Sequence, residues 1–114
     1  MGFYPKNRPD LLTRLVIDAL KVWERMEEGH RAVSRYRMEE KVILIKAPTL
    51  VMAGTEDWSS FPRIKPLADS IKGSETAIIE GGMIPMVDQV PEEFATAVLN
   101  FLNKSKRVGD FRNR

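Results

Sequence analysis

The sequence predicts an α/β fold built around a short parallel sheet with flanking helices. Two largely apolar runs, near residues 49–53 and 76–80, have the length of buried strands. Apolar residues recur at three- and four-residue spacing near 62–72 and 91–103, which is typical of helices. The order strand, helix, strand, helix predicts a right-handed crossover, and the two strands should therefore be parallel.

Local signals support the ends of these elements. Pro48 can only open a strand, because it has no N–H to donate to a sheet, and Gly54 follows the same strand. Pro91 suits the first turn of the last helix, where Glu92 and Glu93 are favourably placed near the positive end of the helix dipole. The residues expected to face inward on this helix are Phe94, Ala95, Val98, Phe101 and Leu102.

The first forty residues predict helices. Asn7 can cap a helix over 9–28, with Pro9 in its first turn and Gly29 as its stop. A second, shorter helix is expected over 30–40. The first helix carries an apolar stripe, which predicts a face packed on the core, with a partner-binding surface as the alternative. The stripe consists of Leu12, Leu15, Val16, Ala19, Val22, Trp23 and Met26.

The composition of the 114 residues is ordinary for a globular protein, with 43% hydrophobic and 30% charged residues. The absence of cysteine excludes disulfides and thiolate metal sites, and His30 is the single histidine, so we expect no metal and no cofactor. His30 lies in no catalytic motif and is expected at the surface. We find neither a signal-peptide pattern nor an apolar run of about 20 residues, so a cytoplasmic protein without a membrane segment is expected.

The last residues of the chain are basic, and we expect residues 105–114 to form a disordered tail. A basic tail can bind nucleic acid. No series of aromatic residues accompanies this one, however, so we do not expect nucleic acid as a partner.

Two turns carry the candidate chemistry. The first, Gly54-Thr55-Glu56-Asp57, follows the carboxyl end of a predicted strand, where functional groups of α/β sheets gather. Its aspartate could orient an imidazole, or it could simply cap the next helical region with Ser59 and Ser60. The second turn, Gly81-Gly82-Met83, follows the other predicted strand and precedes Asp88, Pro91, Glu92 and Glu93.

In their order and spacing, these turns resemble the C-terminal portion of the α/β-hydrolase superfamily over residues 41–102. The resemblance implies that Asp57 occupies the position of the acid in a Ser-His-Asp triad, and that Met83 replaces the histidine. A thioether cannot act as a general base. The nucleophile motif of the family, glycine-any-serine-any-glycine, is absent from this chain. The serines, none in that context, are Ser34, Ser59, Ser60, Ser70, Ser74 and Ser105.

The resemblance divides the chain into a cap-like helical segment (1–40), a hydrolase-like segment (41–104) and the tail (105–114). It predicts the C-terminal part of an ester or acyl hydrolase that is not catalytic as this chain alone. The alternative is a non-catalytic binding or assembly module derived from the same fold. Because the strand over 49–53 would lack a neighbour, we expect a homodimer or a complementary N-terminal hydrolase subunit as partner.

Overall fold

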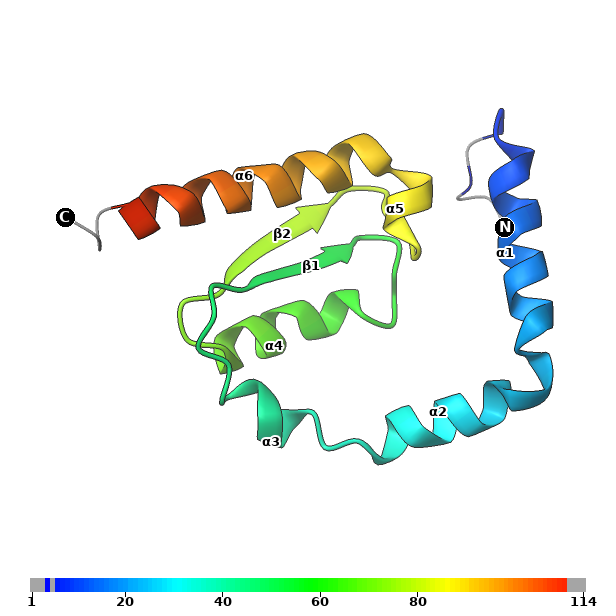
Figure 1. Ribbon diagram of the computed structural model, residues 1–114, viewed down its shortest axis with the longest axis horizontal. Helices are drawn as coiled ribbons and strands as arrows, with labels where there is room; N and C mark the ends of the chain where they lie inside the picture. Colours follow the sequence, from blue (N-terminus) through cyan, green and yellow to red (C-terminus); the bar gives the residue numbers. More distant parts are fainter. Residues whose placement is uncertain (1–3, 5, 111–114) are drawn as a thin grey trace.

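The computed structural model describes residue 4 and residues 6–110, and it shows a small α/β unit with a helical arm (Figure 1). The arm consists of α1 (Pro9–Lys21), a 3₁₀ turn (Trp23–Arg25) and α2 (Met26–Arg35). A short helix, α3 (Glu39–Val42), leads from the arm to the sheet. The remaining elements are β1 (Leu50–Gly54), the 3₁₀ turn Phe61–Arg63, α4 (Ile64–Ser70), β2 (Glu75–Ile79), α5 (Met86–Gln89) and α6 (Pro91–Asp110).

The two strands form a parallel sheet, as the sequence predicts. Leu50 pairs with Glu75 at one end and Gly54 pairs with Ile79 at the other. Both strands begin and end within one residue of the expected positions. The connecting helix α4 contacts both strands, and α6 contacts β2, so the sheet lies between these two helices (Figure 1).

The core lies between β1 and α4. Alternate residues of β1, Val51 and Ala53, are buried against one face of the sheet. They form a cluster with Ile64 and Ile71 at the two ends of α4 and with Val42 from α3. Partly buried side chains at its edge are Phe61, Leu67 and Ala68.

The prediction of one helix over 9–28 that stops at Gly29 is wrong. The helix is interrupted at Val22, whose backbone (φ −113°, ψ 6°) departs from helical values, and α2 then continues through Gly29 to Arg35. Two local ion pairs, Glu27 with Arg31 and Glu28 with Arg25, offset part of the cost of the glycine in this helix. The expected helix over 30–40 is divided, because Tyr36 has an extended backbone.

The prediction that the stripe on the first helix packs on the core is also wrong for most of its members. Leu15, Val16 and Trp23 are 38%, 44% and 67% exposed, and the buried residue of α1 is Leu11 instead. Figure 1 shows the reason, because α1 and α2 run around the sheet unit and do not lie on it. Where α1 approaches α5, Arg14 forms an ion pair with Asp88.

The last helix is longer than expected. It continues past residue 103 to Asp110, so the first part of the expected tail, residues 105–110, is helical. This stretch contains no proline, and its Lys106 and Arg107 are good helix formers. Residues 111–114 lie outside the described part of the chain. None of the helices within residue 4 and residues 6–110 has both the length and the apolar character of a membrane-spanning segment.

The molecule is elongated for its size. Its extents are 51 × 36 × 25 Å and its radius of gyration is 16.9 Å, whereas a compact domain of this length has a radius of about 13 Å. The accessible surface is 9422 Å², and a compact monomer of the same mass exposes about 6,300 Å². The arm therefore leaves much of the chain's apolar surface uncovered.

Candidate functional site

The two turns that carry the predicted site residues lie side by side at the carboxyl edge of the sheet. The backbone N–H of Thr55 donates to the carbonyl of Ile79 (3.0 Å), and the N–H of Glu56 donates to the carbonyl of Gly82 (3.0 Å). Asp57 follows the donor of this second bond, and Met83 follows its acceptor. The structure thus joins the two turns through their backbones.

Glycine allows this close approach. A Cβ atom added to Gly54 would lie 2.0 Å from the carbonyl oxygen of Gly82, so no other residue fits at position 54 without a backbone shift. Gly81 adopts a positive φ of 69°, which side chains disfavour. Its N–H donates to the hydroxyl of Thr55 (2.9 Å), which ties the start of the second turn to the first.

Asp57 is buried, with 3% of its surface exposed. Its Oδ1 accepts hydrogen bonds from the Ser59 N–H (3.2 Å), the Ser59 hydroxyl (2.8 Å) and the Ser60 N–H (3.1 Å). Burial raises the pKa of the carboxyl group, but the hydrogen bonds from Ser60 and Ser59 lower it by more, so the pKa lies below its ordinary value. This geometry is that of a capping aspartate, and it keeps the side chain ionised.

Met83 is half-buried in the turn after β2. Its thioether is a weak hydrogen-bond acceptor and supplies no proton-transfer group. His30 lies in α2, in the arm, where its Nδ1 is 2.9 Å from the carbonyl oxygen of Met26. That bond is local to one helical turn, and it occupies one of the two ring nitrogens.

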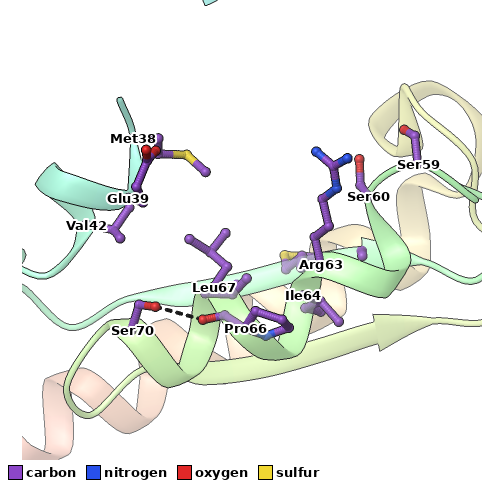
Figure 2. A pocket seen from close by; sticks show the side chains of 13 residues that line it. Met38, Glu39, Val42, Ser59, Ser60, Arg63, Ile64, Pro66, Leu67 and Ser70 are labelled. Atoms are coloured by element: carbon purple, nitrogen blue, oxygen red, sulfur yellow. Dashed lines mark hydrogen bonds between the residues drawn. The ribbon is translucent and has the colours of Figure 1, made fainter. Parts of the chain in front are cut away.

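A groove between β1, α3 and α4 was not foreseen from the sequence (Figure 2). Its volume is about 550 Å³, within the usual range for ligand sites. Glu39 and Arg63 lie at opposite ends of it (Figure 2). The lining residues are Met38, Glu39, Val42, Val51, Met52, Ala53, Ser59, Ser60, Arg63, Ile64, Pro66, Leu67 and Ser70.

The groove could not be read from local pattern because it depends on the break at Tyr36. That break separates α3 from α2 and lets Val42 pack with β1 and α4. The one signal in the sequence that could have indicated the groove was the apolar run of β1, for which the sequence offers no second neighbouring strand. A shallower hollow of about 500 Å³ lies between β2 and α6, with Glu92 and Glu93 at its border.

No group of three or more histidine or acidic side chains comes together as a metal site within the part of the chain that the structure describes. Comparisons with protein-family models, with curated proteins and with solved structures give no match.

Proposed function

We propose that this chain forms the late part of an α/β-hydrolase-type fold and is not catalytic by itself. The observation that supports this is the hydrogen bond from the Glu56 N–H to the Gly82 carbonyl (3.0 Å). It brings the turn with the acid position, Asp57, beside the turn with the histidine position, Met83. Both turns follow neighbouring parallel strands, the edge at which α/β enzymes place their functional groups.

The chemistry of the two positions argues against turnover. A triad needs its nucleophile, base and acid together, and the loss of one member removes most of the activity. Met83 cannot accept a proton, and the Asp57 carboxylate is held by Ser59 and Ser60. On this proposal, the aspartate retains its structural role while the position of the base has become a packing site, as in a pseudoenzyme. We also propose the cytoplasm as the compartment of this chain.

An esterase assay tests the proposal. We expect no hydrolysis of p-nitrophenyl acetate or butyrate by the full chain above the buffer rate. The Met83→His variant should remain inactive as well, because no activated serine stands beside the new imidazole. The matched control is Asp69→Ala, which removes an exposed carboxylate that pairs with Lys65. Turnover that disappears in Asp57→Ala but persists in Asp69→Ala would contradict the proposal.

The second candidate function is a binding or assembly module derived from the same fold. The observation that favours it is the sheet edge at β1, which pairs with β2 alone among the described residues. A two-stranded sheet is a poor independent unit. The partner would be a second copy of this chain or a complementary hydrolase-type subunit. Light scattering at micromolar concentration should give a mass above 13.0 kDa, and a cooperatively melting monomer would contradict this function.

A further inference from the structure

The outer edge of β1 is open to pairing with another strand, and the inference drawn from this edge rests on the assembly role proposed above. Successive residues of a strand direct their N–H and C=O groups to opposite sides, so one side of β1 bonds to β2 and the other presents unpaired groups. Such an edge can accept one more strand. Val51, Met52 and Ala53 of β1 also line the groove, so the edge and the groove form one continuous surface.

The two ends of the groove carry opposite charges. Glu39 of α3 lies toward the amino end of β1, and Arg63 follows its carboxyl end (Figures 1 and 2). Arg63 is exposed and forms no ion pair with any other described residue, whereas Glu39 forms an exposed ion pair with Arg37 (2.8 Å). A partner that reverses the strand direction would therefore meet the opposite charge at each end.

We propose that this partner is a second copy of the chain, bound by antiparallel pairing of the two β1 strands about a two-fold axis. The axis exchanges the two ends of the groove, so Arg63 of each copy faces Glu39 of the other, and the contact occurs twice. In this arrangement α3 of each copy enters the groove of the other beside Arg63. The two sheets combine into one of four strands, which satisfies the open edge of β1 in each copy.

The surface area of the chain is sufficient for such an interface. Each copy exposes 9422 Å², about 3,000 Å² more than a compact monomer of this mass. Obligate dimers bury about 2,000–5,000 Å² in total, half of it from each partner. Much of this excess lies on the arm, so the charges decide the occupant: a second copy places a Glu39 beside Arg63 at both ends of the interface, whereas an acidic peptide meets Arg63 once.

Charge reversal in the full chain tests the proposal. Arg63→Glu and Glu39→Arg should each raise the dimer dissociation constant about tenfold or more, because each places like charges together at two points of the interface. The double variant should return the constant to within about threefold of the original. The control is Lys72→Glu, the same charge change at an exposed position outside the groove, which should leave the constant unchanged. Sedimentation velocity over a dilution series measures the constant, and circular dichroism checks that each variant is folded.

The other outcomes separate this interface from the broader assembly role. A dimer that neither single variant weakens would overturn the β1 interface and leave the assembly role standing. If both single variants weaken the dimer and the double variant does not restore its dissociation constant, the two-fold pairing is overturned and a different occupant of the groove is favoured. A monomer at every concentration would overturn both proposals.

Discussion

Asp57 shows how a buried charge is kept in a small protein. An unpaired buried carboxylate would be strongly unfavourable, yet this one accepts bonds from two backbone N–H groups and one hydroxyl. These donors belong to Ser59 and Ser60, at the start of the turn that leads into α4. The aspartate therefore links the edge of the sheet to the helix that covers it, and this role requires no catalysis.

Replacing Asp57 should lower stability in a pH-dependent way. We expect Asp57→Ala to reduce the free energy of unfolding by about 1–2 kcal/mol at pH 7, the usual cost of losing a capping side chain. Because the pKa is lower in the folded state, the stabilisation is present above the ordinary value of 3.8 and is lost as the pH falls through the folded pKa. Urea unfolding at pH 7 and at pH 3 measures the free energy of unfolding of variant and parent. The difference between the two free energies should be smaller at pH 3.

The exposed Asp69 provides a comparison for this measurement. Its ion pair with Lys65 lies at the surface, where such pairs contribute about 0–1 kcal/mol. Asp69→Ala should therefore change stability less than Asp57→Ala. Two outcomes would show that the Asp57 hydrogen bonds are not what stabilises the turn. One is an equal loss of unfolding free energy in the two variants, and the other is a loss in Asp57→Ala that does not change with pH.

At the scale of elements, two glycines in different environments should respond in opposite ways to the same change. Gly54→Ala should destabilise the protein by about 1–3 kcal/mol or more, because its Cβ would meet the Gly82 carbonyl and force the two turns apart. Gly29→Ala lies inside α2 with nothing within 4 Å of the added Cβ. It should stabilise the helix by about 0.5–1 kcal/mol. Thermal melting followed by circular dichroism compares the two, and a neutral Gly54→Ala would contradict the observed contact between the turns.

Elements whose pattern and surroundings agree were predictable. β1 is a continuous apolar run between Pro48 and the turn at Gly54, and burial in the sheet favours the same conformation that the local sequence does. The arm was not predictable in the same way. Its apolar stripe indicates a helix, but periodicity does not say what the stripe contacts, and Leu15 and Trp23 prove to be exposed. The helix also passes through Gly29, and the ion pair of Glu27 with Arg31 offsets part of the cost of that glycine.

The whole molecule shows the same limit for its candidate site. The turns at Asp57 and Met83 could be located because each follows a strand and begins with glycine. The groove is lined at its two ends by Glu39 and Arg63, which lie far apart in the sequence. The sequence pattern did not reveal that Glu39 belongs to a short helix, α3, separate from α2. Tertiary packing around Val42 brings these elements together, and one sequence carries no direct signal of such a contact.

The attachment of the arm has a consequence for how the protein should respond to proteases. The stretch from Lys21 to Arg37 has no buried residue, and segments with few buried contacts open most readily. Brief trypsin treatment should therefore cut first within this stretch, where the basic residues Lys21, Arg25, Arg31, Arg35 and Arg37 are exposed. Mass spectrometry of early time points should show a resistant fragment that retains β1 through α6. First cleavage after Arg63 or Lys72 would mean instead that the sheet unit opens before the arm. If the arm is cut first, the junction near Val22 is the place at which a tag or a second domain could be inserted with the least disturbance of the sheet.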